Sequence, residues 1–465
     1  MSPWLATVAA GTKDDFYQGM VNLGDGSMYY GASRATATSG DMVYAGDAGD
    51  NLCAIGLLDP VLVAGKIVVC DRGAYARVDK SLAVAIAGGT GMVLANVGPG
   101  SLNADLHYVP SVHVNVADGD AIRAYAQGTG ATGSLEGNNF LEVEAPYVAA
   151  FSSRGPNQAG GDLLKPDIMA PGVDVLAAVS PYSAGQDWDF YSGTSMSSPH
   201  IAGLGALLTD AHPNWTPAMM KSALMTTATT LTNQGNTIPG GPFAYGAGQV
   251  VPNSAVDPGL VYNAGFLDWF GFLCGTGQLN SPSCPFLEID PSDLNYPSIA
   301  IGELAGEQTI VRTVTNVGSA GTYNVSVDAP AGIDVAVSPT SLTLASGESA
   351  SYNVTFTTNG SATIGAYTNG SLTWSDGTHD VTSPLVMRPF QLAAPSELAS
   401  SGTDNSLSFD VTFGYAGDYT AAAHGLEPAT TQDGNVVDDP ANDINTALAA
   451  GVGVTFEFVS VPAGT

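Results

Sequence analysis

The chain has 465 residues, 45% hydrophobic and 12% charged, which excludes a mostly disordered protein and allows two to four domains. Its 12 Lys and Arg residues stand against 43 Asp and Glu residues, a net charge of −31. This balance argues against nucleic acid and anionic membranes as partners, because both attract basic side chains. No apolar run is long enough to span a membrane, and the first residues lack the basic segment of a signal peptide, so we expect any export signal outside this sequence.

Residues 1–22 are a short mixed segment, and residues 23–141 are expected to form a compact α/β unit. Three apolar runs in this unit predict buried strands, at 66–70 (KIVVC), 91–97 (GMVLANV) and 109–116 (VPSVHVNV). A segment with helical apolar spacing precedes the second run and ends at Gly88 and Gly89. The succession of strand, helix and strand predicts a βαβ arrangement.

Residues 142–292 have a different character, with strand-like runs at 147–153 (YVAAFSS) and 174–180 (DVLAAVS), followed by two predicted helices. The first helix is expected from about Ser197 to His212. One face of it should carry four apolar residues, Ile201, Leu204, Leu207 and Leu208. The second helix is expected to begin with Thr216 as N-cap and proline at its first position.

From residue 293 the pattern is all-β. Short alternating runs separated by turn residues predict a β-sandwich over 293–389. Residues 390–397 read as a linker, and residues 398–465 as part of a further β-rich domain.

The four cysteines form two local pairs, Cys53 with Cys70 and Cys274 with Cys284. Disulfides, a metal site and unrelated thiols are all compatible with this spacing. The absence of a CxxC motif and of nearby histidines argues against zinc. We therefore favour two disulfides and an oxidising compartment.

The string GTSMSSPH (193–200) places Ser195 directly before an amphipathic helix. Free backbone N–H groups and the positive end of the helix dipole meet at such a junction, where they can stabilise an oxyanion. Gly193 would allow close approach of a substrate backbone. Taken alone, the position is more typical of a structural N-cap serine than of a nucleophile.

The neighbouring strings decide between these readings. GTSMSSPHIAG, together with FSSRGPN (151–157) and KPDIMAPG (165–172), resembles the subtilases, a family of serine proteases. GKIVVCDRG and GGTGMVLAN resemble the protease-associated domain inserted in the branch that includes plant subtilases. DLNYPSIAI and VRTVTNVG resemble the fibronectin type III-like domain that follows it. The resemblance covers about residues 1–390.

The resemblance implies an α/β subtilisin-like catalytic core, here partial, with an inserted α/β protease-associated domain and all-β sandwich domains after it. The core would comprise residues 1–22 and 142–292. Ser195 would be the nucleophile, with Gly193 and Thr194 in the oxyanion and substrate loop. The family's cysteines match Cys53 and Cys70, and with less agreement Cys274 and Cys284.

The sequence departs from the family in one respect. The motifs for the catalytic Asp, the catalytic His and the oxyanion Asn, which subtilases carry before the insert, do not occur here. None of the six histidines reads as a substitute base: His107, His113, His200, His212, His379 and His424 are all expected to have structural or surface roles. Asp167 and Asp174 are expected to make structural hydrogen bonds.

The sequence therefore predicts a fragment of a secreted serine endopeptidase that acts on proteins or peptides through an acyl-enzyme on Ser195, and that is inactive as this chain alone. The alternatives are a non-catalytic, protein-binding pseudoprotease and a structural β-protein. No cofactor and no metal site is predicted; the aspartates would permit calcium, but no EF-hand loop is present. The asparagines that lie in N-x-[ST] sequons include Asn324, Asn353, Asn359 and Asn369.

Overall fold

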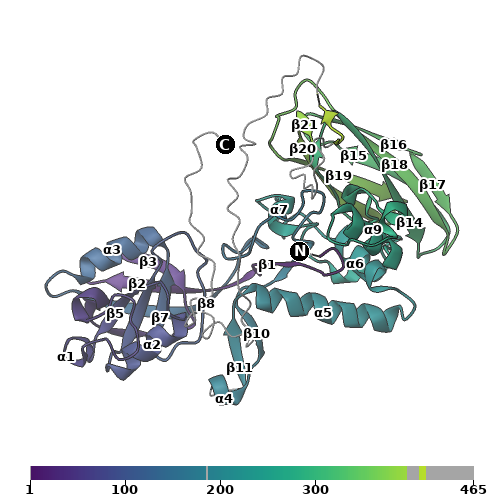
Figure 1. Ribbon diagram of the computed structural model, residues 1–465. Helices are drawn as coiled ribbons and strands as arrows, with labels where there is room; N and C mark the ends of the chain where they lie inside the picture. Colours follow the sequence, from purple (N-terminus) through teal and green to yellow (C-terminus); the bar gives the residue numbers. More distant parts are fainter. Residues whose placement is uncertain (1, 185–186, 395–407, 415–465) are drawn as a thin grey trace, which may run out of the picture. The chain divides into compact units, whose positions relative to one another are not determined.

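The computed structural model describes residues 2–184, 187–394 and 408–414. Their elements fall into three groups, which we call the core segment (residues 2–14 and 143–292), the barrel unit (15–142) and the sandwich (293–394) (Figure 1). The β-rich domain expected over 398–465 lies outside the described residues except for 408–414.

In the core segment, a two-stranded parallel sheet pairs β1 with β9, in register from Val8 opposite Ile168 to Gly11 opposite Pro171. Helix α5 packs against both strands, and Ile201 and Leu208 are buried with Ile168. The strands are β1 (Val8–Gly11), β9 (Ile168–Pro171), β10 (Val175–Ala178), β11 (Trp188–Tyr191) and β12 (Leu260–Tyr262). The helices are α4 (Pro181–Ala184), α5 (Thr194–Ala211), α6 (Pro217–Thr226), α7 (Pro242–Tyr245), α8 (Pro252–Ala255), α9 (Phe266–Gly275) and α10 (Cys284–Leu287).

Two expectations for the core segment were wrong. The run 147–153 is no strand: Val148 makes only an isolated bridge to Gly11, and the chain then turns, with the N–H of Ser152 donating to the carbonyl of Ala149. Leu207 is 66% exposed, because successive residues of a helix are about 100° apart and Leu207 is therefore rotated away from buried Leu208. Helix α6 begins as predicted, with the Thr216 hydroxyl accepting from the N–H of Met219.

The barrel unit is a closed barrel with the strand order β2-β3-β7-β6-β5-β4-β8. As the βαβ pattern predicts, β5 and β6 are parallel and helix α2 connects them. All residues of β5 are buried, because alternate side chains face α3 on one side and α2 on the other. The strands are β2 (Asp15–Leu23), β3 (Met28–Ala32), β4 (Thr38–Tyr44), β5 (Ile67–Asp71), β6 (Gly91–Ala95), β7 (Ser111–Val114) and β8 (Thr132–Glu142). The helices are η1 (Ala45–Ala48), α1 (Pro60–Val63), α2 (Arg77–Ile86) and α3 (Val116–Ala126).

The predicted strand 109–116 is shorter than expected, because α3 begins at Val116 with the side chain of Asn115 accepting from the N–H of Asp118. Asn115 therefore ends the strand segment by acting as N-cap of the helix.

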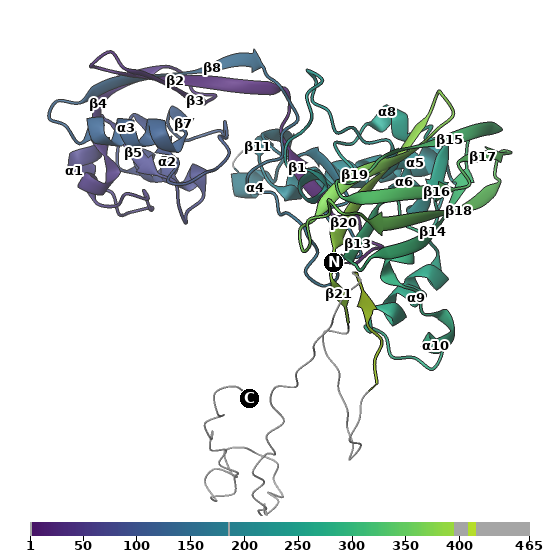
Figure 2. The ribbon, with the colours of Figure 1, turned by 90° about the horizontal axis from the view of Figure 1, so that it is seen from above.

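The sandwich consists of two sheets, ordered β12-β14-β18-β16 and β13-β20-β19-β15-β17, and Figure 2 labels all of their strands except β12. Its interior holds large aromatic side chains, among them Trp374 and Tyr352 in edge-to-face contact. Its strands within 293–394 are β13 (Ile299–Leu304), β14 (Glu307–Asn316), β15 (Gly321–Asp328), β16 (Ile333–Ser338), β17 (Ser341–Leu344), β18 (Ser349–Thr358), β19 (Thr368–Ser375) and β20 (Asp380–Pro389). The short helix η2 (Pro291–Asp293) precedes them, and a separate pair of strands follows, β21 (Leu392–Ala393) and β22 (Thr412–Phe413).

One strand of the sandwich, β12, precedes residue 293, where the sequence predicts the sandwich to begin. Strand β12 belongs to the core segment by sequence, yet it pairs antiparallel with β14, Leu260 lying opposite Asn316. The Tyr262 hydroxyl is hydrogen-bonded to Tyr352 at 2.7 Å and to Ser383 at 2.9 Å inside the sandwich. In the expected linker 390–397, β21 pairs with β22, so this stretch is partly a strand.

Candidate active site

Ser195 lies in the first turn of α5, which begins three residues earlier than the sequence predicts. Gly193 is the N-cap, and its carbonyl accepts from the N–H groups of Met196 and Ser197. The N–H groups of Thr194 and Ser195 donate to no other group among the described residues. The Ser195 side chain is exposed, so a free hydroxyl and free N–H donors lie together at the positive end of the helix.

Gly193 leaves room above these donors. A Cβ atom at Gly193 would lie 3.7 Å from the backbone nitrogen of Ser195 and 3.7 Å from the sulfur of Met196. No clash prohibits a side chain there, but one would occupy space next to the free N–H of Ser195. Glycine therefore keeps this space available to another molecule.

The loop before Ser195 is held by Asp174. This buried carboxylate accepts from the Ser192 hydroxyl at 3.0 Å and from the N–H of Ala104 at 3.0 Å. The side-chain amide of Asn103 donates to Ser192 Oγ at 2.8 Å. One hydrogen-bonded group thus joins the Ser195 loop to residues 103–104 of the barrel unit, and Asp174 has the structural role expected from the sequence.

Ser195 opens into a cavity of about 690 Å³. One wall comes from the core segment and includes Tyr191, Gly193 and Met196. The other wall comes from the barrel unit, where Arg77 donates to both oxygens of Asp105, one bond measuring 2.9 Å. Burial disfavours the charge of Arg77, but the Asp105 carboxylate raises its pKa overall. The cavity is large enough for several residues of a peptide.

None of the five histidines that the structure describes is hydrogen-bonded to Ser195. Nδ1 of His200 is 2.7 Å from the carbonyl of Met196, and His212 stacks on Trp215. His113 accepts from the N–H of Asn103, and burial lowers its pKa to about 3. His107 lines the same cavity as Ser195, but burial and then Arg77 lower its pKa to about 4. The remaining one, His379, lies between two aspartates of the sandwich and the core segment.

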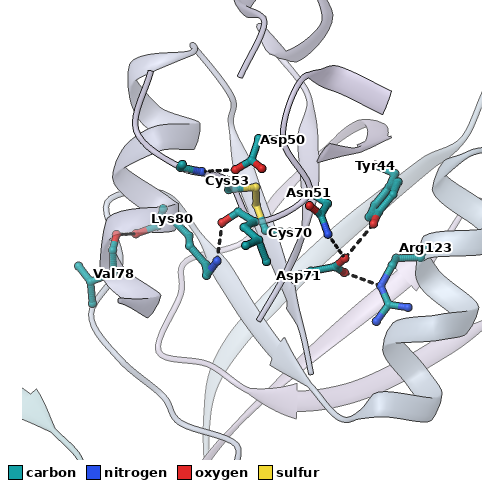
Figure 3. Close-up of a disulfide and its surroundings, with 12 residues drawn as sticks. Tyr44, Asp50, Asn51, Cys53, Cys70, Asp71, Val78, Lys80 and Arg123 are labelled. Carbon is teal, nitrogen blue, oxygen red and sulfur yellow. Dashed lines mark hydrogen bonds and ion pairs between the residues drawn. A yellow bond between two sulfur atoms is a disulfide. The ribbon is translucent and has the colours of Figure 1, made fainter. Parts of the chain in front are cut away.

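Both cysteine pairs favoured by the sequence are bonded. Cys53 and Cys70 have Cα atoms 5.8 Å apart, and Cys274 and Cys284 have Cα atoms 5.3 Å apart. Next to the first disulfide, Asp71 is held by Tyr44, Asn51 and Arg123 (Figure 3). The disulfide therefore ties residues 51–53 to the end of β5, the strand that leads to the cavity wall.

The sequence analysis did not identify Arg72 and Arg77 of the barrel unit, which line the cavity next to Ser195. Arg72 follows β5 and Arg77 begins α2, so both lie at the carboxyl end of a parallel strand, where ligands often bind in α/β sheets. The string CDRG directly after a predicted buried strand was the available signal.

Among the described residues, no three His, Cys, Asp or Glu side chains are grouped so that they could hold a metal ion. No helix in the same part of the chain is long and apolar enough to cross a membrane.

Comparisons with known proteins agree with the fold and the motifs. Residues 28–248 match the subtilase family, and residues 293–387 match the fibronectin type-III domain. The chain is 41% identical over 430 residues to the subtilisin-like protease SBT1.7 of Arabidopsis thaliana, covering 83% of this chain and 57% of the relative. It is 39% identical over 443 residues to SBT1.4 of the same plant, covering 83% of this chain and 56% of the relative.

A solved subtilisin-like protease, Apa1 from the Antarctic psychrotroph Pseudoalteromonas sp. AS-11, shares 17% identity over 53% of this chain and 50% of its own. Its TM-score is 0.21, which is too low to support a conclusion. The plant relatives carry the assignment, although the chain spans little more than half of their length. The chain therefore contains a segment of the subtilase family, over residues 28–248, followed by a fibronectin type-III domain.

Proposed function

We propose that this chain is the serine-bearing part of a secreted subtilisin-like endopeptidase that cleaves peptide bonds through an acyl-enzyme on Ser195. The observation that carries the proposal is the exposed Ser195 hydroxyl beside its own free N–H at the start of α5, in a cavity of about 690 Å³. Attack by this oxygen on a carbonyl would place the developing oxyanion near that N–H, which would stabilise it.

Each part of the loop has a role in this chemistry. Gly193 keeps the space next to the N–H of Ser195 open, and Thr194 contributes a second free N–H at the helix start. Asp174 and Ser192 are positioning residues, because they fix the loop without contacting the reacting atoms. In this reading the barrel unit is a protease-associated domain whose residues form one wall of the substrate cavity.

The wider setting fits a protease outside the cell. Two disulfides favour an oxidising compartment, and the net charge of −31 disfavours nucleic acids and anionic membranes as partners. A protein or peptide substrate remains the partner that the cavity and the family suggest.

We further propose that this chain alone does not turn over substrate. None of the described histidines is hydrogen-bonded to Ser195, and the motifs that carry the catalytic His and Asp in the family are missing from the sequence. Loss of the triad histidine in a subtilisin costs about 10⁶ in turnover, a value taken from that enzyme.

A fluorophosphonate probe tests these statements. We expect slow labelling of the isolated chain, lost in Ser195→Ala and kept in Ser198→Ala, which removes an exposed hydroxyl from the same helix. Rapid labelling would contradict the proposed inactivity.

Hydrolysis tests the function itself. A chimera that carries the upstream segment of SBT1.7 before this chain should cleave denatured casein, and Ser195→Ala should abolish the cleavage. Cleavage that survives Ser195→Ala would refute the role of Ser195, and a folded chimera without activity would favour the pseudoprotease reading.

A further inference from the structure

A second cavity, of about 340 Å³, adjoins the one that contains Ser195. Most of its lining comes from the barrel unit, with Phe151 of the core segment at one side. The lining includes Arg72, Arg77 and the glycine-rich loop 97–101, and it contains no Asp or Glu side chain. In a chain with 43 acidic and 12 basic residues, a cavity lined by two arginines and no carboxylate is unusual.

The cavity is rich in hydrogen-bond donors that have no acceptor among the described residues. Arg72 uses Nη1 on the carbonyls of Gly73 and Tyr75, at 3.0 and 3.3 Å, which leaves its Nε and Nη2 groups. Arg77 uses Nε and Nη2 on Asp105 and leaves Nη1. The backbone N–H groups of the loop residues Gly98, Gly100 and Ser101 also donate to no described group. Such a set of donors matches the oxygen atoms of an anion.

The charge of Arg72 is not compensated. No carboxylate of the described residues lies within ion-pair distance of it, whereas Arg77 has Asp105. Burial and then the nearby charge of Arg77 lower the pKa of Arg72, with Asp105 opposing them. Burial and the neighbouring Arg77 thus both disfavour the positive charge of Arg72. A bound anion would compensate this charge and would itself be stabilised by it.

Arg72 and Arg77 line both cavities, so the donor set faces the space in front of Ser195 as well as the smaller cavity. Asp79 and Asp189 line the larger cavity but not the smaller one. An anionic group of a ligand would therefore meet less repulsion from carboxylates in the smaller cavity. A peptide held over Ser195 would pass close to the arginines.

We propose that Arg72, with the loop 97–101, forms a subsite that binds a carboxylate of the peptide held at Ser195. This subsite rests on the proposed function, because the peptide is the substrate. The carboxylate belongs either to an acidic side chain or to the C-terminus of the peptide. Arg77 supports the subsite with its remaining N–H donor, while its ion pair with Asp105 holds the wall in place.

Binding tests the proposal without requiring hydrolysis. The full chain carrying Ser195→Ala is titrated into fluorescein-labelled, C-terminally amidated decapeptides in which one Glu is moved along a neutral Ala and Ser background. Each peptide is compared with an otherwise identical peptide in which Gln replaces the Glu. One further peptide has no acidic side chain but keeps a free C-terminal carboxylate. Fluorescence polarisation at low ionic strength gives the dissociation constants.

We expect at least one acidic peptide, or the peptide with the free C-terminus, to bind about tenfold more tightly than its uncharged twin, as charge-assisted hydrogen bonds allow. A preference for Glu at one position identifies a side chain, and a preference for the free C-terminus identifies a terminal carboxylate. Arg72→Gln should remove the preference, and Arg72→Lys should keep only part of it, because lysine lacks the planar fork.

Lys66→Gln is the matched control, since it removes one half-buried positive charge from the barrel unit at a position that lines neither cavity. It should leave the preference unchanged. Equal binding of charged and uncharged twins, an absence of binding, or an equal loss in Arg72→Gln and Lys66→Gln would overturn the subsite. Labelling of Ser195 by the fluorophosphonate is independent of these results, so failure of the subsite and failure of the proposed nucleophile can be told apart.

Discussion

Asp174 accepts a hydrogen bond from the Ser192 hydroxyl at 3.0 Å, three residues before Ser195. The same carboxylate accepts from the N–H of Ala104 in the barrel unit. Asp174 also has a φ of 50°, in the left-handed region that Asp and Asn tolerate better than most residues. The position of the serine loop thus depends on a residue that is distant from it in sequence.

Replacement of Asp174 by Asn should destabilise this loop. Asn keeps the left-handed backbone but replaces one accepting oxygen by an NH₂ group, which faces donors and leaves one of them unpaired. We expect the free energy of unfolding to fall by about 1–3 kcal/mol, measured by urea denaturation. Asp210→Asn, on the exposed side of α5, should change it by less than about 0.5 kcal/mol. Equal effects of the two substitutions would contradict the role given to Asp174.

Removal of the buried carboxylate Asp167 should be more severe. It accepts from Lys165 at 2.7 Å, from the N–H of Thr7 at 2.6 Å and from the Tyr296 hydroxyl, and Lys221 is 3.0 Å away. Burial lowers the pKa of Lys221 to about 7, against the attraction of Asp167. Asp167→Asn would leave the buried ammonium group of Lys165 and the partly buried one of Lys221 without a carboxylate, so we expect a loss of about 3–5 kcal/mol in unfolding free energy.

If the Asp167→Asn chain does not accumulate in folded form, Tyr296→Phe provides a milder measurement. It removes one hydroxyl from the same cluster and should cost about 1–3 kcal/mol in urea denaturation. A neutral result for Tyr296→Phe would show that the cluster does not stabilise the fold in this way.

His379 should make stability depend on pH. Its Nδ1 is 2.9 Å from Asp376 of the sandwich and its Nε2 is 3.3 Å from Asp257 of the core segment. The hydrogen bond to Asp376, then that to Asp257, raises the pKa of His379 against the effect of burial. A raised pKa in the folded state means stabilisation that is complete below the unfolded pKa of about 6.5 and disappears as pH rises through the folded value.

The measurement is the unfolding free energy of the wild-type chain minus that of His379→Gln, taken between pH 5 and 9. We expect this difference to be largest at the acidic end and to decline above about pH 6.5. Asp257→Asn should shift the decline to lower pH, because one of the two carboxylates that hold the proton is gone. A difference that does not vary with pH would exclude the charged contact.

Local patterns of the sequence predicted the local structure well. The βαβ succession around residues 66–97 and the cap at Thr216 were correct, because alternation, helical spacing and capping chemistry act over a few residues. The run 147–153 has the composition of a strand but turns at Ser152, since its place beside β1 is decided by contacts distant in sequence.

The sequence could not predict contacts between residues that are distant from one another along the chain. Lys165 and Lys80 are fully buried although lysine is an exposed residue type, because carbonyls from other segments of the chain, those of Leu5 and Leu52, accept from their ammonium groups. For the candidate site, the motif identified Ser195 and Gly193 as the residues to consider. For Arg72 the string CDRG was the available signal, whereas Arg77 could be recognised only from the cavity that it shares with the Ser195 loop.

Because of strand β12, the sandwich cannot be excised intact at the boundary of its homology match. The fibronectin type-III match begins at residue 293, but Leu260–Tyr262 forms the outer strand next to β14. A polypeptide cut at residue 293 would leave β14 as a bare edge and would leave the Tyr352 hydroxyl without the partner that Tyr262 provides. Bare edges favour aggregation. The sandwich is therefore not an exchangeable module with its own boundary, and recombination at the homology boundary would yield a defective sheet.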